Sequence, residues 1–93
     1  MSEIIQVNVI VKGRVQGVYY RLHTREAAIE KGVTGYVKNC PDRSVEAVFQ
    51  GSPEQVDAMV QWCHSGSPAS AVSSVTRENV SALDTFNGFE IRY

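Results

Sequence analysis

Alternating apolar and polar residues mark the extended segments of this chain. In residues 5–12 apolar residues alternate with mostly polar ones, which is typical of a β-strand that buries one face. Two further strands, over residues 33–39 and 44–50, are separated by the turn-like Cys-Pro-Asp-Arg at 40–43, which predicts an antiparallel hairpin. Two more strands are expected late in the chain, a weaker one near a sheet edge over residues 71–80 and a closing one over residues 89–93.

A helical period separates these strands at two places. The first helix is expected over residues 20–31, with Gly32 as a left-handed stop. A second helix begins after Ser52, the expected N-cap, where Gln55 completes a capping box, and it ends at the Ser-Gly-Ser-Pro run of 65–68. The inward stripes are expected to be Tyr20, Thr24, Ala27, Ala28 and Lys31 on the first helix, and Val56, Met59, Val60 and Cys63 on the second.

The order of these elements predicts a fold class. Strand, helix, strand, strand, helix, strand is the split βαβ plan, in which two helices cover one face of an antiparallel sheet, and here an extra C-terminal strand follows. We therefore expect an α+β, ferredoxin-like βαββαβ sandwich formed by a single domain over residues 1–93. This plan hosts many activities, so it does not by itself determine function.

Composition narrows the classes of partner. The formal net charge of −1 and a pI near 6.1 do not favour nucleic-acid binding. No run of eighteen apolar residues is present and residues 1–3 lack a basic leader, so we expect no membrane span and a cytoplasmic location. Cys40 and Cys63 do not follow a metal-ligand spacing and are expected to be reduced thiols. No apolar surface stripe demands a partner, which favours a monomer.

The loop between the first strand and the first helix is the strongest candidate site. Gly13 and Gly17 allow the backbone to turn sharply and to approach a ligand closely, and the free N–H groups at a helix start attract anions. Arg21 falls in the first helical turn, where the helix dipole disfavours a cation unless an anion shares the site. On these residues alone, a phosphate site and a tight turn with a solvated Arg21 both remain open.

The run from Gly13 to Arg21 resembles the acylphosphatase signature G-x-V-Q-G-V-x-[FY]-R. A second family block, G-x-[VA]-x-N followed by an acidic turn and a valine, is matched by residues 35–39, Asp42 and Val45. The resemblance extends from residue 4 to residue 93. The family turn after the asparagine often contains glycine, whereas this chain has Pro-Asp-Arg, so the shape of the hairpin turn is expected to differ.

The resemblance implies a function and roles for particular residues. The family hydrolyses small acyl phosphates to carboxylate and inorganic phosphate without a metal or another cofactor. Arg21 would bind the phosphoryl oxygens, and Asn39 would orient the attacking water. A small open site that grips mainly phosphate is expected to discriminate poorly between acyl groups. The phosphate would be wrapped by the backbone N–H groups of Val15, Gln16, Gly17, Val18, Tyr19 and Tyr20.

Structural explanations compete with these roles. Asn39 precedes Pro41 and Asp42, so by its chemistry alone it is more simply a turn residue, an interpretation that the second family block reverses. Tyr19 and Tyr20 are most simply packing residues.

Two other functions fit the same fold. Similar domains occur at the N-terminus of larger hydrogenase-maturation proteins that handle carbamoyl phosphate, so this chain is alternatively a non-enzymatic module of that type. An RNA-binding domain of the same topology would need exposed aromatic residues on its central strands. The strand at 44–50 has one aromatic residue and an acid, which does not fit.

Overall fold

The computed structural model describes residues 3–81 and 83–93. Within these residues the element order is the predicted one. The first strand is longer than expected and reaches Arg14, and the bounds of the other elements lie within one residue of the expected ones. The elements are β1 (Ile5–Arg14), α1 (Tyr20–Lys31), β2 (Thr34–Asn39), β3 (Val45–Gly51), α2 (Pro53–Ser65), β4 (Ala71–Val80) and β5 (Phe89–Arg92).

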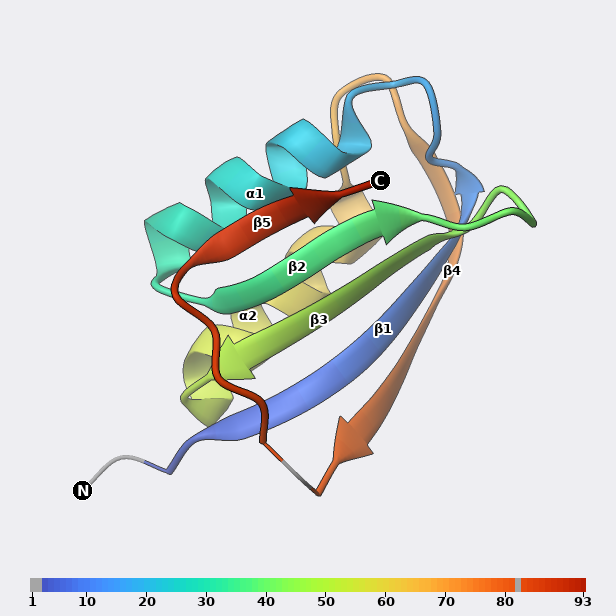
Figure 1. Ribbon diagram of the computed structural model, residues 1–93. Helices are drawn as coiled ribbons and strands as arrows, with labels where there is room; N and C mark the ends of the chain where they lie inside the picture. The colour runs from blue at the N-terminus through green and yellow to red at the C-terminus, as the bar shows by residue number, and fades with distance from the viewer. Residues whose placement is uncertain (1–2, 82) are drawn as a thin grey trace.

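The strands form one sheet in the order β4-β1-β3-β2-β5 (Figure 1). The neighbouring pairs among β1 to β4 are antiparallel, and β4 lies at an edge as predicted. After β4 at one edge of the sheet, the chain crosses to the opposite edge. There β5 pairs with β2 in parallel. The predicted ferredoxin-like fold is confirmed, and the extra C-terminal strand makes the sheet mixed rather than wholly antiparallel.

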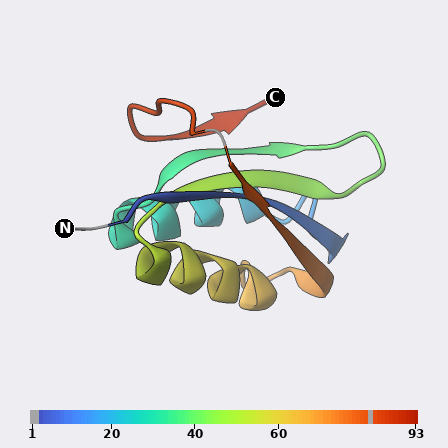
Figure 2. The ribbon, with the colours of Figure 1, turned by 90° about the horizontal axis from the view of Figure 1, so that it is seen from below.

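Both helices cover the same face of the sheet (Figure 2). Val7, Val9 and Val11 of β1 point to this face and are 0% exposed, so the alternation in the sequence correctly identifies the buried side of the strand. The predicted helix stripes are buried as well, with Val60 partly buried at the margin and Lys31 half-exposed. The buried helix residues are Tyr20, Thr24, Ala27 and Ala28 on α1, and Val56, Met59 and Cys63 on α2.

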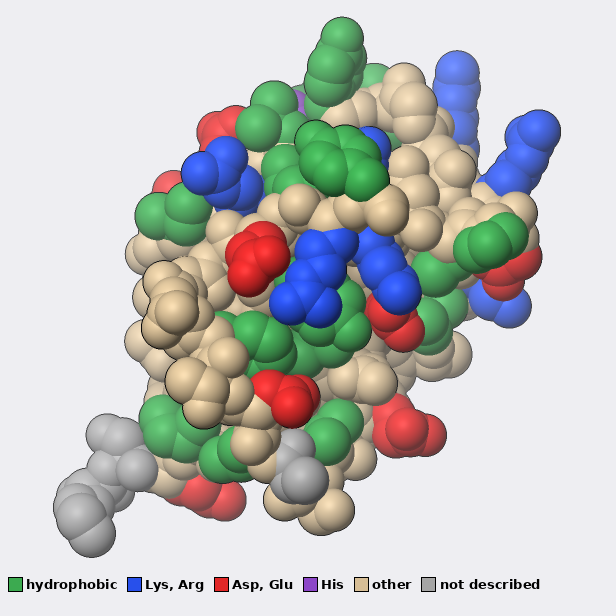
Figure 3. All heavy atoms as spheres, in the orientation of Figure 1, with side chains coloured by type: hydrophobic (Ala, Val, Ile, Leu, Met, Phe, Trp, Pro, Cys, Tyr) green, Lys and Arg blue, Asp and Glu red, His purple; other side chains and the backbone are tan. Residues whose placement is uncertain are grey.

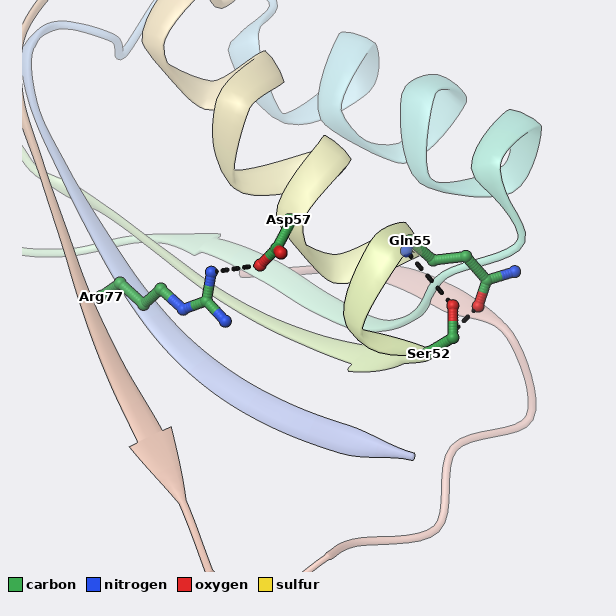
Figure 4. A network of polar contacts seen from close by, with 4 residues as sticks. All are labelled: Ser52, Gln55, Asp57 and Arg77. Carbon is green, nitrogen blue, oxygen red and sulfur yellow. Dashed lines mark hydrogen bonds and ion pairs between the residues drawn. The ribbon is translucent and has the colours of Figure 1, made fainter. Parts of the chain in front are cut away.

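The start of α2 has the predicted capping box (Figure 4). The N–H of Gln55 donates to Oγ of Ser52 over 3.2 Å, and the N–H of Ser52 donates to Oε1 of Gln55 over 2.9 Å. Two N–H groups at the helix start are thereby satisfied. One turn further on, Asp57 forms an ion pair of 2.6 Å with Arg77 of β4, which links the helix to the edge strand.

The hairpin turn between β2 and β3 accommodates arginine where glycine would be easier. The N–H of Arg43 donates to the carbonyl oxygen of Cys40 over 3.1 Å, with Pro41 at the position that favours a type I turn. Arg43 has φ 73°, a left-handed conformation that is costly for a residue with a Cβ atom. Asp42 stabilises the turn by accepting hydrogen bonds from the hydroxyl and the N–H of Ser44, and these bonds lower the pKa of Asp42.

The sheet face opposite the helices carries acidic, basic and apolar side chains side by side (Figure 3). On this face Nε2 of Gln6 donates to Oδ2 of Asp84 over 2.9 Å. Nε2 of Gln50 donates to Oε1 of Gln6 over 3.0 Å and to the carbonyl oxygen of Asp84 over 2.8 Å. These bonds fix the segment that leads into β5, so the end of the chain is held beside β2 and α1.

Candidate active site

The loop from Val15 to Tyr19 joins β1 to α1 by a sharp turn. Gly17 has φ 73° and Tyr19 has φ 58°, so two residues in the left-handed region are separated only by Val18. No atom outside the neighbouring residues lies within 4 Å of a Cβ placed on Gly17, so glycine is favoured here by its backbone angle and not by lack of space. Tyr19 is the N-cap of α1 and makes no side-chain capping bond.

The N–H groups of this loop are free of protein acceptors. Within the described residues, none of the N–H groups of residues 15–19 donates to a backbone or side-chain acceptor. The first turn of α1 also contains no acidic side chain that would offset the positive end of the helix. The loop and the helix start together therefore present unsatisfied donors and partial positive charge to an anion.

Arg21 is the second residue of α1, and its side chain is held by the C-terminal residues Arg92 and Tyr93. Its Nη1 donates to the carbonyl oxygen of Arg92 over 3.1 Å. Its Cζ lies 4.7 Å from the ring centroid of Tyr93, a cation–π arrangement. Arg92 and Tyr93, which lie at the far end of the sequence from Arg21, thus orient the guanidinium. Its remaining N–H groups are available to a ligand.

Asn39 is the last residue of β2 and lines the same pocket as Arg21. Its Oδ1 atom is buried and is the one buried side-chain polar atom without a hydrogen-bond partner among the described residues. Leaving such an atom unsatisfied costs about 1–3 kcal/mol. A hydrogen-bond donor that reaches this atom would remove the cost. Asn39 therefore ends β2 ahead of the turn and lines the pocket, so its interpretation as a turn residue is wrong.

Gln16 connects the loop to the hairpin that carries Asn39. Its Nε2 donates to the carbonyl oxygens of Cys40 over 2.9 Å and of Ser44 over 2.8 Å. The N–H of Cys40 also donates to Ser44 over 2.9 Å, so the three residues form one closed network at the base of the turn. The side chain of Gln16 therefore fixes the distance between the loop and Asn39.

One pocket of about 510 Å³ brings most of the predicted site residues together. Gln16 and Val18 are not among its lining residues. The carbonyl oxygen of Val18 instead accepts a hydrogen bond of 3.0 Å from the buried hydroxyl of Ser67, which braces the loop from outside. The pocket is lined by Val15, Gly17, Tyr19, Tyr20, Arg21, Leu22, Asn39, Ile91 and Tyr93.

The two adjacent tyrosines have different environments. Tyr20 is buried as predicted, and its hydroxyl donates to the carbonyl oxygen of Cys63 on α2 over 3.0 Å. Burial raises the pKa of the Tyr20 phenol and raises the pKa of the Cys63 thiol to about 12. Tyr19 is 75% exposed, so its prediction as a packing residue was wrong. Its left-handed backbone turns the side chain outward, and the sequence gives no signal for that conformation in a tyrosine.

The C-terminal residues are the part of the site that the sequence analysis missed. Ile91 and Tyr93 line the pocket, and Arg92 binds Arg21 through its carbonyl oxygen. Figure 1 shows the C-terminus beside the first turns of α1 and the end of β2. A signal was present in the alternation of Phe89, Ile91 and Tyr93, but it does not reveal the strand with which β5 pairs.

The cysteines, potential metal ligands and helix lengths of the described residues were each the subject of an expectation from the sequence. Cys40 is half-buried and Cys63 is buried, and both thiols are free. The described part of the chain holds no group of three or more His, Cys, Asp or Glu side chains placed to bind a metal ion. No helix in residues 3–81 or 83–93 has the length and apolar character needed to cross a membrane.

Comparison with known proteins gives consistent matches over the fold. A family model described as acylphosphatase matches residues 7–91, a range that includes Arg21 and Asn39. An acylphosphatase of Natronomonas pharaonis is 50% identical, with 99% of both chains covered. The solved acylphosphatase of Bacillus subtilis is 32% identical with a TM-score of 0.92, covering 96% of this chain and 99% of its own. That of Coxiella burnetii is 34% identical with a TM-score of 0.91, covering 96% and 93%.

Proposed function

This chain belongs to the acylphosphatase family, and we propose that it hydrolyses small acyl phosphates by metal-free, in-line attack of water on the phosphoryl group. It is a hydrolase that acts on acyl phosphates. The observation that carries the proposed mechanism is the pocket in which Arg21, Asn39 and the loop of residues 15–20 meet. Each of these parts has an unsatisfied group suited to one task in the reaction.

The phosphoryl group would be held by the loop and by Arg21. The free N–H groups of residues 15–19 and the start of α1 supply donors and partial positive charge for its oxygens. The guanidinium of Arg21 adds a full charge, and its contacts with Arg92 and Tyr93 hold it in place before substrate arrives. Donors that are already oriented stabilise the charge of the transition state without reorganisation at the moment of reaction.

Water would be placed by Asn39. The side-chain amide of Asn39 belongs to the pocket lining, where it can hydrogen-bond a water and leave a lone pair of the water oxygen for phosphorus. An amide is too weak a base to remove the proton, so the role of Asn39 is orientation. The network of Gln16 with Cys40 and Ser44 would keep this water at a fixed distance from the bound phosphoryl group.

The bond changes need no general acid. The water oxygen bonds to phosphorus as the bond from phosphorus to the acyl oxygen breaks, and the bonding electron pair leaves with the carboxylate. A carboxylate is already a stable anion, so it needs no proton on departure. The protons of the water end on the inorganic phosphate, with a phosphoryl oxygen as the immediate acceptor. The reaction then depends on positioning and charge stabilisation, which are the features of this pocket.

Hydrolysis of benzoyl phosphate, followed by ultraviolet absorbance, tests the proposal. Wild-type protein should give turnover that EDTA does not reduce. Arg21→Gln should fold normally by circular dichroism and lose at least roughly a hundredfold in kcat/KM, because a transition-state charge contact is gone. Arg25→Gln is the matched control, since Arg25 is an exposed arginine one turn along the same helix and does not line the pocket.

Three outcomes would count against the proposal. Loss of activity with EDTA that added metal restores would exclude the metal-free mechanism. Near-normal kinetics of folded Arg21→Gln would remove Arg21 from it. Absence of turnover by folded wild type would favour the alternative of a non-enzymatic acyl-phosphate-binding module, in which the loop binds phosphate without chemistry.

A further inference from the structure

Three large apolar side chains are exposed around the pocket that contains Arg21 and Asn39. Tyr19 is 75% exposed, Leu22 is 42% exposed and Tyr93 is 97% exposed, and all three line this pocket. They are half of the exposed large apolar residues found in the described part of the chain. Single exposed apolar residues are ordinary, but a cluster of them around a pocket is typical of a binding surface.

The positions of these side chains are not explained by the packing of the fold. Tyr19 is not buried, makes no side-chain capping bond and occupies a left-handed conformation that is uncommon for an aromatic residue. Tyr93 extends past the end of β5 and is held by the guanidinium of Arg21 against its ring. The two rings and Leu22 therefore stand beside the group that would bind the phosphoryl oxygens.

The pocket is also larger than its phosphate end requires. Its volume of about 510 Å³ falls within the range of about 300–1,000 Å³ that is usual for small-molecule sites, and a phosphoryl group fills only a part of it. In an acyl phosphate the acyl carbon is bonded to the oxygen that bridges it to phosphorus. A phosphoryl group held by Arg21 and the loop therefore places the acyl group within the remaining volume, next to the apolar side chains.

We propose that Tyr19, Leu22 and Tyr93 form an acyl rim that selects acyl phosphates with an aromatic or bulky apolar acyl group over acetyl phosphate and carbamoyl phosphate. The inference rests on the proposed function of the same pocket. Aromatic rings gain both buried area and ring–ring contacts from such a rim, whereas acetyl and carbamoyl groups are too small to cover it. The poor discrimination expected from the sequence is thereby replaced by a preference for apolar acyl groups.

The charges of the pocket support an uncharged acyl group. Arg21 is the one charged side chain among the residues that line the pocket. The phosphoryl group would occupy Arg21, so a carboxylate elsewhere on the acyl chain would lie against apolar side chains without a partner. Placing an ionised carboxylate there without a partner is unfavourable.

Kinetics with two substrates on three proteins test the acyl rim. We would measure kcat/KM for benzoyl phosphate and acetyl phosphate with wild type, Leu22→Ala and Ile29→Ala. Ile29 is 59% exposed on the same helix and does not line the pocket, so Ile29→Ala controls for loss of an exposed apolar side chain from α1. Dividing the benzoyl-to-acetyl ratio of each variant by that of wild type cancels the intrinsic reactivities of the two substrates.

The ratio should fall roughly fivefold in Leu22→Ala and stay at the wild-type value in Ile29→Ala, as expected for loss of a few methylene contacts. A second measurement does not depend on turnover. Benzoylphosphonate, which cannot be hydrolysed at phosphorus, should inhibit wild type at a roughly tenfold lower concentration than acetylphosphonate, and Leu22→Ala should narrow this gap.

Equal inhibition by the two phosphonates, or an unchanged substrate ratio in folded Leu22→Ala, would overturn the acyl rim while leaving the proposed hydrolysis intact. Failure of folded wild type to hydrolyse either substrate would instead overturn the proposed function, and the acyl rim with it. The two kinds of failure are therefore distinguishable in one set of assays.

Discussion

The side-chain amide of Gln16 donates a hydrogen bond of 2.9 Å to the carbonyl oxygen of Cys40, the residue that follows Asn39. Because Gln16 belongs to the loop before α1 and Cys40 to the turn after β2, this bond joins the two segments that would hold the phosphoryl group and the water. The second bond of the same amide, to Ser44, makes the connection rigid.

We expect Gln16→Ala to lower kcat roughly tenfold or more while the fold is retained. The substitution keeps both segments but removes the hydrogen bonds that fix their relative position, and small errors in the relative position of reacting groups are costly. Steady-state kinetics on benzoyl phosphate would measure this, with Gln61→Ala, an exposed glutamine of α2, as the matched control. A Gln16→Ala protein with wild-type kcat would show that Gln16 serves the hairpin alone.

Asn39→Ala should lower kcat roughly a hundredfold with a small change in KM. The reason is that Asn39 is proposed to orient the attacking water and not to bind the phosphate. Asn79→Ala, at an exposed asparagine of β4 outside the pocket, should behave as wild type. Inhibition by inorganic phosphate should be similar in the Asn39 variant and wild type. A raised KM with unchanged kcat would make Asn39 a residue of substrate binding.

The features that could be predicted from the sequence depend on residues close together in the chain, and the features that could not depend on residues far apart in it. The capping box of Ser52 and Gln55 and the buried stripe of β1 depend on residues close in sequence, so local pattern was sufficient. The parallel pairing of β5 depends on the route of the chain across the sheet, which has no local signal.

The site shows the same division. The resemblance to a family predicted that Arg21 and Asn39 belong together, and the structure brings both into one pocket. It did not predict that Arg92 and Tyr93 orient Arg21, because those contacts join the first helix to the end of the chain. The exposure of Tyr19 was also missed, because no sequence pattern shows that its left-handed backbone turns the side chain outward while the adjacent Tyr20 is buried.

Arg43→Gly should raise the free energy of unfolding by about 1 kcal/mol. Arg43 has φ 73°, and the left-handed region costs a residue with a Cβ atom about 1–2 kcal/mol, part of which is offset by the greater freedom of glycine in the unfolded chain. Urea denaturation would measure the change. Arg43→Ala is the matched control, because it removes the same side chain and keeps the Cβ atom. Equal stability of the glycine and alanine variants would contradict the strain at this turn.

The burial of Tyr20 and Cys63 should make the fold sensitive to alkaline pH. The Cys63 thiol has its pKa raised from 9.0 to about 12, and the pKa of Tyr20 is raised above its ordinary 10.0, in both cases mainly by burial. The unfolded chain therefore loses the thiol proton from about pH 9 and the phenol proton from about pH 10, while the folded chain keeps both. The stabilising contribution is complete below pH 9 and is lost progressively as pH rises towards 12.

Urea denaturation at several pH values between 8 and 11, a range chosen around the ordinary thiol pKa of 9.0, would measure this loss. Cys63→Val removes one titrating group and Tyr20→Phe removes the other, so each variant should show a shallower fall in the free energy of unfolding than wild type. Tyr20→Phe also loses the hydrogen bond to the carbonyl oxygen of Cys63, which lowers its stability by about 1 kcal/mol at neutral pH. Curves that run parallel to wild type in both variants would assign alkaline unfolding to other groups.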